Sequence, residues 1–497
     1  MTANGTGVQP DQTGHSKKLG SQESLTRHEW VGLMNKHNLA DGHSRLAQSD
    51  RMLEIVAGLP ELYTVADHRG QVELEREFEE AYFTLAGQPS VLRREQHALH
   101  FYSSSLAMEA VANHLRLREM SIGVLHPTFD NIPAILRRHG LEPKQVPEQI
   151  FDEPENPAFY QDLDSLLLVV PNNPTGTDAP IDVLKRIALS CKAAGVLLIL
   201  DFSFRFFSRH LSTVDFYGFL AEEGVAHIGI EDTGKTWPTL DLKVGTLIAD
   251  PSCHAGLQAI TDDMLLNVSP FVFALVAEYI RRDGARESLR VEGRNRAVLR
   301  ESLAGGPLQL IDPPGPMSVA WLRMPEGWVD TEAADWLAEQ GVSVLPGGPF
   351  FWDDREEGQS YLRVAMMRPE DEFATGAAAL AEAAARYRPG GGPGRPELAE
   401  LVLTAVAQLL TCPQPTAEDD FFVLGGDSLS AMHLVGRLAQ DTGLPLRVKM
   451  LLDAPVLGDF VDRVAGVLEQ QGAAEAAPDP AHRLRSLFAD QRAGAEA

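Results

Sequence analysis

The stretch LLLVVPNNPTGTD occupies residues 166–178. Its first five residues form a continuous apolar run of strand length, and the residues after them are rich in turn-forming Pro, Asn and Gly. A strand with one face in solvent alternates apolar with polar residues, whereas a strand covered on both faces is apolar throughout. Residues 166–170 are therefore predicted to form a buried strand that ends in a polar turn.

Two further runs have the same character. VLLIL (196–200) and HIGI (227–230) are of strand length, and helical patterns such as IDVLKRIALSCKAAG (181–195) lie between the runs. Buried strands that alternate with helices indicate βαβ units and a parallel sheet. The sequence therefore predicts an α/β fold from about residue 25 to residue 387.

A polar side chain follows each of the three runs. Asn173 lies in the turn after the first, Asp201 directly follows the second, and Lys235 comes shortly after the third. Ligands of α/β sheets bind off the carboxyl ends of the strands, so we expect these three side chains to face one crevice. A lysine there can form a Schiff base with a carbonyl cofactor, and an aspartate can keep a pyridine nitrogen protonated. Taken singly, such a turn or aspartate is often structural, but the order and spacing are more specific.

The order of four features resembles the class I and II aminotransferases, which are fold type I enzymes that use pyridoxal 5′-phosphate (PLP). The features are NNPTG, Asp201, Lys235 and then Arg363 in YLRVAMMRP. The resemblance covers about residues 25–387. It implies a mostly parallel seven-stranded sheet with helices on both faces and a small C-terminal subdomain. It also implies that Lys235 carries PLP, that Asp201 meets the pyridine nitrogen and that Asn173 meets O3′. Arg363 would hold the substrate α-carboxylate as a bidentate fork.

The same resemblance assigns the rest of the cofactor site. Phe129 of HPTFDN would stack on the ring. Ser103, Ser104 and Ser105 precede a helical pattern, and they would cradle the phosphate at the helix start. Lys243 stands where the family usually has a phosphate-binding Arg. A lysine there would supply the positive charge but not the two parallel hydrogen bonds of a guanidinium.

Two positions depart from the family pattern. Phe204 replaces the usual Tyr, and Asp232 replaces a Ser or Thr that binds the phosphate. A carboxylate aimed at a phosphate would be repelled. We therefore expect Asp232 to face the substrate or to bind a cation.

A closer resemblance accounts for both departures. Six motifs together resemble the PLP-dependent L-arginine oxidases and hydroxylases, which use PLP and O₂ without flavin or metal. The motifs are LTRHEW, NLADGH, YSSSLAME, HPTFDNI, DFSFR and IEDTGKTWPTLDLK. By this resemblance Ser203 would bind O3′, and Asp232, Glu29 and Asp41 would hold the guanidinium. His43 would transfer a proton near the quinonoid, and Thr26 would lie on a helix that closes over the substrate.

Several of these residues also have structural interpretations. Thr26 and Glu29 have the spacing of a capping box, flanked by a Leu25–Trp30 hydrophobic staple. His43 alone is more often structural, although its place in NLADGH favours a functional role. Ser203 could simply cap a turn.

The C-terminal part forms a separate module. RPGGGPGRP (388–396) has the composition of a linker, and residues 397–469 have helical patterns. Residues 397–469, with EDDFFVLGGDSLSAM (418–432), resemble an all-α four-helix acyl- or peptidyl-carrier domain. This resemblance implies that Ser428 receives 4′-phosphopantetheine at a helix start, whereas the structural alternative is an ordinary helix cap. We expect flexible tails at residues 1–23 and 470–497.

Composition excludes some classes of protein. The formal charge of −27 over 497 residues argues against nucleic-acid binding, which needs a basic face. Three scattered cysteines indicate reduced thiols of a cytoplasmic protein and no metal site. The N-terminus lacks the apolar region of a secretory signal, and the apolar run from Met264 is interrupted by polar residues, so no membrane span is expected.

The leading hypothesis is a PLP- and O₂-dependent oxidase or hydroxylase of free L-arginine, fused to a carrier domain. Its product would be a hydroxylated or dehydro 2-keto or imino arginine, with H₂O₂ released. Expected partners are nonribosomal peptide synthetase components, a phosphopantetheinyl transferase and a second copy of the chain in a homodimer or higher oligomer. Because Arg363 needs a free carboxylate, free arginine is favoured over a carrier-bound substrate. The alternatives are an aminotransferase, a PLP-dependent cyclase acting on arginine or hydroxyarginine, an enzyme for a carrier-bound amino acid, and a carrier scaffold with an inactive PLP fold.

Overall fold

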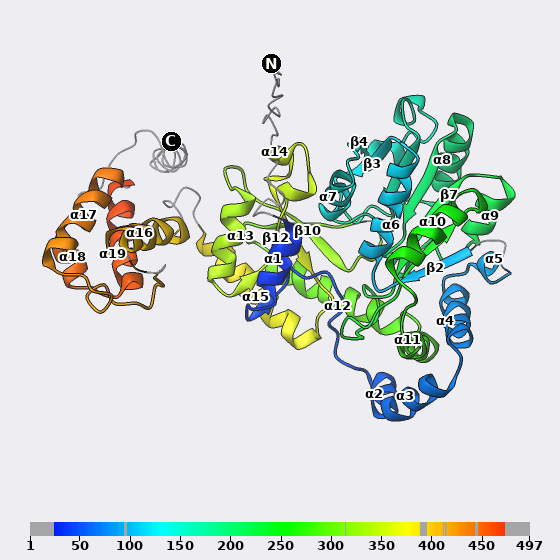
Figure 1. Ribbon diagram of the computed structural model, residues 1–497, viewed down its shortest axis with the longest axis horizontal. Helices are drawn as coiled ribbons and strands as arrows, with labels where there is room; N and C mark the ends of the chain where they lie inside the picture. Colours follow the sequence, from blue (N-terminus) through cyan, green and yellow to red (C-terminus); the bar gives the residue numbers. More distant parts are fainter. Residues whose placement is uncertain are drawn as a thin grey trace, which may run out of the picture. The chain divides into compact units, whose positions relative to one another are not determined.

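The computed structural model describes residues 24–93, 97–313, 315–387, 395–410, 412, 415–442 and 446–472. The chain divides into two compact units, Met1–Tyr387 and Arg388–Ala497, and Figure 1 shows their elements. The tail expected at 1–23, the first seven linker residues and residues 473–497 lie outside the described residues. Helix α16 begins at Arg395, inside the expected linker, and α19 continues to Gly472, beyond the expected end of the carrier.

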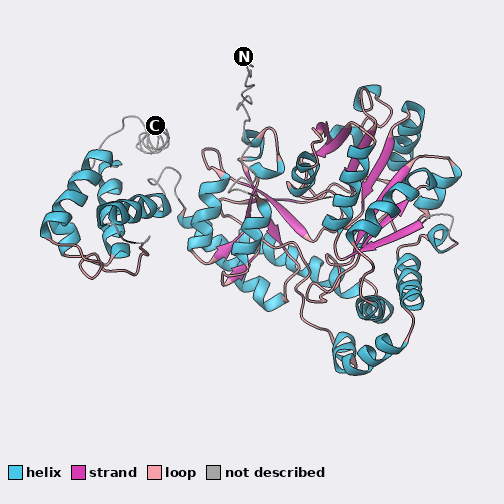
Figure 2. Cartoon of the chain, in the orientation of Figure 1, coloured by secondary structure: helices cyan, strands magenta, loops and turns pink. Residues whose placement is uncertain are grey.

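The first unit is built on a seven-stranded sheet of order β2-β8-β7-β6-β5-β3-β4. Strands β4, β3, β5, β6 and β7 run parallel to one another. Strand β8 runs antiparallel to both β7 and β2. The predicted mostly parallel sheet is thus confirmed, and Figure 2 shows the helices packed around it. The strands are β2 (His97–Phe101), β3 (Ile122–His126), β4 (Lys144–Pro147), β5 (Ser165–Val169), β6 (Leu197–Asp201), β7 (His227–Asp232) and β8 (Gly245–Ala249).

The predicted apolar runs form the centre of this sheet. Strands β5, β7 and β8 are buried at every position. Because residues of a strand point alternately to its two faces, burial at every position means that both faces are covered. The connecting helices are α6 (Ser104–Leu117), α7 (Asn131–Arg138), α8 (Ile181–Ala194), α9 (Phe216–Glu222) and α10 (Pro251–Met264).

A second, antiparallel sheet forms the small subdomain, in the order β12-β13-β10-β9. Strand β13 (Tyr361–Ala365) lies between β10 (Val319–Arg323) and β12 (Leu345–Pro346), so Arg363 stands on a central strand. The other elements of this part are β9 (Gln309–Ile311), β11 (Val342–Ser343), α12 (Arg286–Leu303), α13 (Asp330–Glu339), α14 (Arg355–Gly358) and α15 (Glu370–Arg386).

The N-terminal segment joins the two parts of this unit. Helix α1 (Leu25–Gly32) is followed by β1 (His37–Asn38), which pairs in parallel with β11 of the small subdomain. The chain then enters helices that precede the large sheet, and the longest of them packs on α11. The helices before the large sheet are α2 (Asp50–Ala57), α3 (Leu59–His68), α4 (Gln71–Leu85) and α5 (Pro89–Leu92). Helix α11 (Pro270–Asp283) comes later in the chain.

The second unit is helical, as predicted for a carrier domain. Its helices are α16 (Arg395–Leu410), α17 (Ser428–Thr442), α18 (Val448–Leu452) and α19 (Leu457–Gly472). They enclose one core, in which Val402, Phe421 and Phe460 are fully buried. Among the helices that the structure describes, in either unit, none has the length and apolarity needed to cross a membrane.

Candidate active site

A cavity of about 220 Å³ lies at the carboxyl ends of β5, β6 and β7. Fourteen predicted site residues line it, and Asp41 does not. Six further residues contribute to the wall: Gly42, Met108, Asn131, Ile132, Val169 and Phe204. The predicted residues on the lining are Thr26, Glu29, His43, Ser103, Ser104, Ser105, Phe129, Asn173, Asp201, Ser203, Asp232, Lys235, Lys243 and Arg363.

Lys235 stands in the turn that follows β7. The turn is anchored by the Ser44 N–H, which donates to the Gly234 carbonyl at 3.1 Å. The Lys235 Nζ lies 5.9 Å from the ring centroid of Phe204. Within the described residues it makes no hydrogen bond or ion pair. An amine that faces a cavity with no partner is available for covalent attachment.

Asp201 ends β6, and one of its carboxylate oxygens accepts the Ser203 N–H at 2.8 Å. Burial raises the pKa of Asp201 to about 6. A carboxylate in this state gains stability from a nearby cationic N–H, because that charge offsets its desolvation. A pyridinium nitrogen is a donor of this kind.

Four buried polar atoms on the lining have no hydrogen-bond partner. They are Asn173 Oδ1, Ser203 Oγ, and the Nε and Nη1 of Arg363. Leaving such atoms unpaired is costly, so their grouping at one cavity indicates a polar ligand. The Ser203 hydroxyl and the Arg363 nitrogens can donate, as the predicted contacts with O3′ and with a carboxylate require. The Asn173 Oδ1 can only accept, so the predicted contact with O3′ would use the amide N–H₂ of Asn173. These residues therefore fit PLP and an amino-acid substrate.

The start of α6 is held close to the start of β8. A Cβ atom on Gly245 would lie 2.3 Å from the Ser103 carbonyl carbon and 2.6 Å from the Ser104 nitrogen, so only glycine fits there. Ser103 is the N-cap of α6, and its hydroxyl accepts the Leu106 N–H at 3.2 Å. The Ser105 hydroxyl accepts a hydrogen bond from Asn131 at 3.3 Å. The cradle predicted for a phosphate is thus a helix N-terminus with three serines.

Asp232 takes a position that the sequence did not predict. One oxygen accepts the Ser104 N–H at 3.1 Å, and the other accepts the Gly234 N–H at 2.5 Å. Burial alone would raise the pKa of Asp232, but Lys235, Lys243 and His43 lower it overall. The carboxylate thus binds the backbone at the start of α6 and in the turn after β7 while lining the cavity, and its predicted contact with the substrate stays a prediction. The expectation of nearby cations agrees with these three neighbours.

His43 connects the cavity to a chain of charged groups. Its Nδ1 lies 2.6 Å from an Asp41 oxygen, and its Nε2 lies 2.7 Å from the Lys243 Nζ. The ammonium can only donate, so Nε2 accepts and Nδ1–H donates to Asp41. The charge of Lys235, followed by burial, lowers the pKa of His43. The imidazole is therefore neutral at neutral pH.

Asp41 belongs to this chain and not to the guanidinium site that was expected. Its second oxygen accepts from Arg45 Nε at 3.1 Å. Arg45 also binds Asp241 at 2.9 Å, and Asp241 lies 3.5 Å from Lys243. Burial alone would raise the pKa of Asp41, but its hydrogen bond with His43 lowers it strongly. Arg45 and Asp241 were missed because no local pattern marks them.

Arg363 and Glu29 meet beside the cavity. Arg363 is fully buried, and its Nη2 donates to the Ala40 carbonyl and, at 3.4 Å, to Glu29. Glu29 also accepts the Gly42 N–H at 3.2 Å. Glu29 therefore already has partners in the protein. Gly42 was not predicted as a site residue, although its motif NLADGH was noted.

The predicted capping box at the start of α1 is wrong. The N-cap is Ser24, whose side chain accepts the Arg27 N–H, and α1 begins at Leu25. Glu29 is too far along the helix to close such a box, and it binds Gly42 and Arg363 instead. Trp30 is exposed, so the proposed staple with Leu25 does not form.

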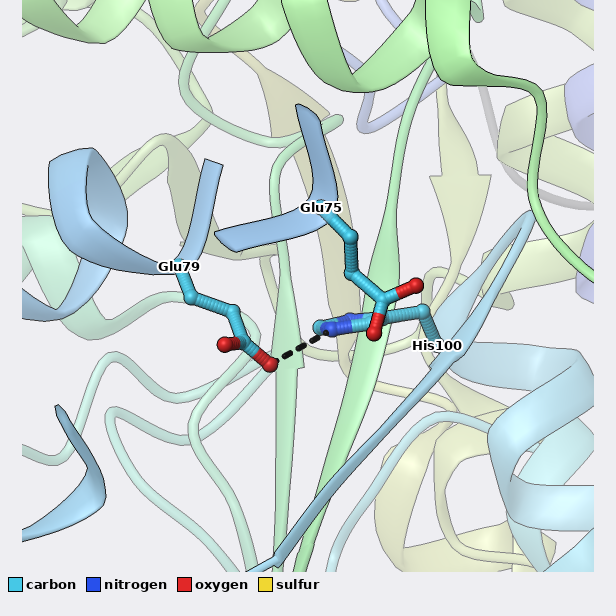
Figure 3. Close-up of side chains that lie close together, drawn as sticks. All are labelled: Glu75, Glu79 and His100. Atoms are coloured by element: carbon cyan, nitrogen blue, oxygen red, sulfur yellow. Dashed lines mark hydrogen bonds and ion pairs between the residues drawn. The ribbon is translucent and has the colours of Figure 1, made fainter. Parts of the chain in front are cut away.

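Within the described part of the chain, one group of side chains could hold a metal ion: Glu75, Glu79 and His100. Figure 3 shows the two carboxylates of α4 beside the imidazole from β2. Both imidazole nitrogens have partners, because Nδ1 lies 3.0 Å from Thr246 Oγ1 and Nε2 lies 3.1 Å from Glu79. We interpret the group as a polar connection between α4 and the sheet.

Ser428 is exposed and is the first residue of α17 in the second unit. The preceding Asp427 caps this helix, since its side chain accepts the N–H groups of Leu429 at 3.1 Å and Ser430 at 2.7 Å. The cap is therefore Asp427, and the Ser428 hydroxyl is left free for modification.

Comparisons with known proteins agree with both units. Residues 64–380 match the family model Aminotransferase class I and II, and residues 400–464 match Phosphopantetheine attachment site. A solved structure described as MppP soaked with the product 2-ketoarginine is 34% identical, with a TM-score of 0.65 over 69% of this chain and 98% of that chain. Aspartate aminotransferase from Thermus thermophilus, with maleate, has a TM-score of 0.59 over 73% of this chain and 97% of that one. At 15% identity this last match shows the fold alone.

Curated relatives match parts of the chain. L-glutamine–4-(methylsulfanyl)-2-oxobutanoate aminotransferase of Bacillus subtilis is 26% identical over 42% of this chain, which spans 52% of that protein. Nonribosomal peptide synthetase criC of Aspergillus cristatus is 40% identical over 15% of this chain and 4% of its own length. The chain thus spans about half of the curated aminotransferase and a small part of the synthetase. The family match over residues 64–380 shows that this chain belongs to the class I and II aminotransferases, with a phosphopantetheine-attachment domain at its C-terminal end.

Proposed function

We propose that this protein is a PLP- and O₂-dependent oxidase or hydroxylase of free L-arginine that acts in nonribosomal peptide biosynthesis. The observation that carries the proposal is that the Lys235 amine and two nitrogens of Arg363 lie on one cavity and have no partner among the described residues. The similarity to MppP, a structure described with 2-ketoarginine, supports an arginine-derived substrate.

The residues that would hold PLP are Lys235 through its amine, Asp201 at the pyridine nitrogen, and Asn173 and Ser203 at the ring oxygen. When bound, PLP supplies an electron sink for the electrons of the broken Cα–H bond. Lys235 Nζ would take the α-proton, because an amine on the cavity wall is a suitable base. Phe204, which stands beside Lys235, has no hydroxyl to donate there.

Arg363 would bind the α-carboxylate through Nε or Nη1, the two guanidinium nitrogens that have no partner among the described residues. This contact would orient the Cα–H bond toward Lys235, and such positioning is a large part of catalysis. The apolar side chains of Met108, Ile132 and Val169 on the lining reduce water in the cavity. Exclusion of water would favour electron transfer to O₂ over reprotonation.

His43 would move a proton at Nε2. Asp41 fixes the tautomer in which Nε2 is an acceptor, and Lys243 is the group that donates to it. A substrate guanidinium would find Glu29 on the lining, where it would share the carboxylate with Arg363. In the oxidase reaction two electrons pass from the substrate to O₂, which takes up two protons and leaves as H₂O₂.

The carrier domain would act in a separate step. Ser428 would receive 4′-phosphopantetheine from a phosphopantetheinyl transferase, and the similarity to synthetase segments supports a nonribosomal peptide partner. A free carboxylate is needed at Arg363, so we favour free arginine over a carrier-bound substrate.

We also propose at least a homodimer in the cytoplasm. Leu240 and Leu266 are 80% and 96% exposed, which suits a surface covered by a second copy. The three free thiols fit a reducing compartment. Light scattering of the purified protein would measure the oligomeric state directly.

An aminotransferase is the second candidate, because the curated Bacillus subtilis relative has that activity in its name. The decisive experiment incubates the PLP-loaded protein with each free amino acid and follows O₂ uptake, H₂O₂ and product mass. We expect uptake with L-arginine and a lower response with lysine. Amino transfer to a keto acid without O₂ uptake, or uptake only with other amino acids, would overturn the proposal. The Lys235→Ala variant is the control for cofactor-independent oxidation.

A further inference from the structure

The segment of residues 38–45, called the strap below, forms part of the cavity wall. It carries Gly42 and His43, both on the lining. At one end the Ala365 N–H donates to the Leu39 carbonyl at 2.7 Å, which ties the strap to the end of β13. Near the other end Ser44 N–H donates to Gly234, next to Lys235. The strap therefore links the strand of Arg363 to the turn of Lys235.

Arg368 holds the middle of the strap. Its side chain donates to three strap carbonyls: Asn38 at 2.7 Å, Asp41 at 2.6 Å and His43 at 3.1 Å. A fourth bond goes to the carbonyl of Met367 at 3.0 Å. All four acceptors are backbone atoms. A planar guanidinium can make these bonds in fixed directions at once, whereas a lysine ammonium on a flexible stem cannot.

The position of Arg368 is itself fixed. The side chain of Asn295 on α12 donates to the carbonyls of Met366 and Arg368, at 2.7 and 2.9 Å. Arg368 is only 5% exposed, and burial lowers its pKa to about 10. A buried guanidinium is expensive to desolvate, so its four backbone bonds are needed to keep it there. The strap is thus anchored to α12 through one side chain.

The strap has little room to shift. A Cβ on Gly42 would lie 3.0 Å from the Nη1 of Arg363 and 4.0 Å from the Nζ of Lys235. A displacement of the strap toward the cavity would therefore press on both groups. A displacement away from it would separate His43 from Lys243.

We propose that Arg368 is a positioning residue of the active site: it holds the strap so that Gly42 lies against Arg363 and His43 meets Lys243. Arg368 does not line the cavity, so it acts through the strap and not on the substrate. The consequence for turnover rests on the function proposed above, but the effect on the strap does not.

The matched control is Arg296. It is also a largely buried arginine that donates to backbone carbonyls, those of Met317 at 2.8 Å and Val319 at 3.4 Å, and it does not contact the strap. Arg296→Lys therefore reports the general cost of shortening a buried guanidinium. Asn295→Ala is a second variant that loosens Arg368 without replacing it, because the Asn295 side chain donates to the carbonyls of Met366 and Arg368.

The test is hydrogen exchange by mass spectrometry on the full-length, cofactor-free protein. For Arg368→Lys we expect exchange of peptides covering residues 38–45 to rise by about tenfold or more, with β5 and β6 unchanged. The pKa of His43, followed by NMR, should also change, because Lys243 would no longer be held against it. Arg296→Lys should leave both measurements as in the parent protein.

If Arg368→Lys does not fold, Asn295→Ala decides by the same two measurements, because it releases Arg368. The assignment would be overturned if hydrogen exchange of residues 38–45 in the test variant were the same as in the parent protein. It would also be overturned if Arg296→Lys accelerated that exchange as much as the test variant does. Once a substrate is known, loss of Arg368 should shift the pH profile of kcat. A purely structural arginine would lower the amount of active protein without moving that profile. Because exchange is measured without PLP or substrate, failure of the proposed reaction leaves this test intact.

Discussion

The Nζ of Lys243 lies 2.7 Å from the Nε2 of His43, although the two residues are 200 positions apart in the chain. Lys243 was expected to bind the cofactor phosphate. In this structure it completes a closed chain of charged groups through His43, Asp41, Arg45 and Asp241, and its contact with a phosphate stays a prediction. The chain ties the N-terminal segment to the loop after Lys235, so His43 and Lys235 are positioned together.

The first prediction concerns this contact. Replacing Lys243 with Met removes a positive charge that lowers the pKa of His43, so that pKa should rise. NMR titration of the imidazole in the cofactor-free protein measures it. Lys192→Met, on the surface helix α8, should not move it. An unchanged pKa in Lys243→Met would mean that the contact is absent in solution.

The second prediction concerns Asp201 and pH. Its pKa is about 6 in the folded protein against 3.8 for an unperturbed aspartate, so the folded state binds this proton more tightly than the unfolded chain does. The free energy of unfolding should therefore fall between about pH 4 and 6, by up to about 3 kcal/mol, and stay lower above pH 6.

Asp201→Asn keeps an acceptor for the Ser203 N–H but removes the charge. In the absence of PLP this variant should be more stable than the parent at pH 7 and no more stable at pH 4. Urea unfolding at both values measures the difference. Asp130, whose pKa burial also raises to about 6, contributes equally to both proteins and cancels. Equal stability of the two proteins at pH 7 would contradict the burial argument.

The third prediction concerns Arg363. Arg363→Lys keeps a positive charge but removes Nε and Nη1, the two guanidinium nitrogens that have no partner among the described residues. Loss of one charge-assisted hydrogen bond costs about 1.5–3 kcal/mol, so substrate binding should weaken about 10- to 150-fold. Spectroscopic titration of the PLP-loaded variant measures this. The amine that corresponds to the substrate without its α-carboxylate should bind the parent protein and Arg363→Lys with equal affinity. Tighter binding of this amine to the parent protein would argue against the assignment.

The fourth prediction concerns a buried ion pair behind the cavity. Arg205 and Glu231 are almost wholly inaccessible, and the hydroxyls of Tyr82 and Tyr217 donate to the same carboxylate at 3.0 and 2.8 Å. Glu231→Gln leaves the guanidinium charge uncompensated, which costs about 3–5 kcal/mol. Chemical unfolding should show this loss. The exposed pair Arg186–Glu155 is the comparison, where Glu155→Gln should cost less than about 1 kcal/mol.

The fifth prediction concerns the carrier domain. Incubation with coenzyme A and a broad-specificity phosphopantetheinyl transferase should add one phosphopantetheine group to the chain, as seen by intact mass. Ser428→Ala should abolish the addition. Ser430→Ala is the matched control, because that hydroxyl is bonded to Asp427 within the first turn of the same helix. Modification of Ser428→Ala would place the attachment site elsewhere.

The sequence predicted the sheet because its signal is local. Strands β5, β6 and β7 were visible as apolar runs, and the residue after each run was assigned to the carboxyl edge without knowledge of other contacts. Asn173, Asp201 and Lys235 therefore appeared as one group from the order of residues alone, and the fold places all three on one cavity. Motif resemblance added His43 and Glu29, which lie outside the sheet.

Three contacts could not be read from the sequence. Ser24 and not Thr26 caps α1, because two serine or threonine side chains stand close to the same helix start and only the backbone direction selects one. Asp232 binds backbone N–H groups at the α6 end, because the approach of β8 to α6 at Gly245 brings Ser104 to it. Asp41 binds His43 and Arg45 because the strap folds back on itself.

By itself, then, the sequence determined the α/β class, the order of the chemistry-bearing residues and the helical second module, since all three follow from periodicity and short motifs. Only the tertiary structure decided that Lys243 meets His43, that Arg363 keeps two N–H groups free and that Arg368 holds residues 38–43. These contacts join residues hundreds of positions apart. Their partners are selected by the path of the backbone between the two subdomains, and no local pattern of side chains encodes that path.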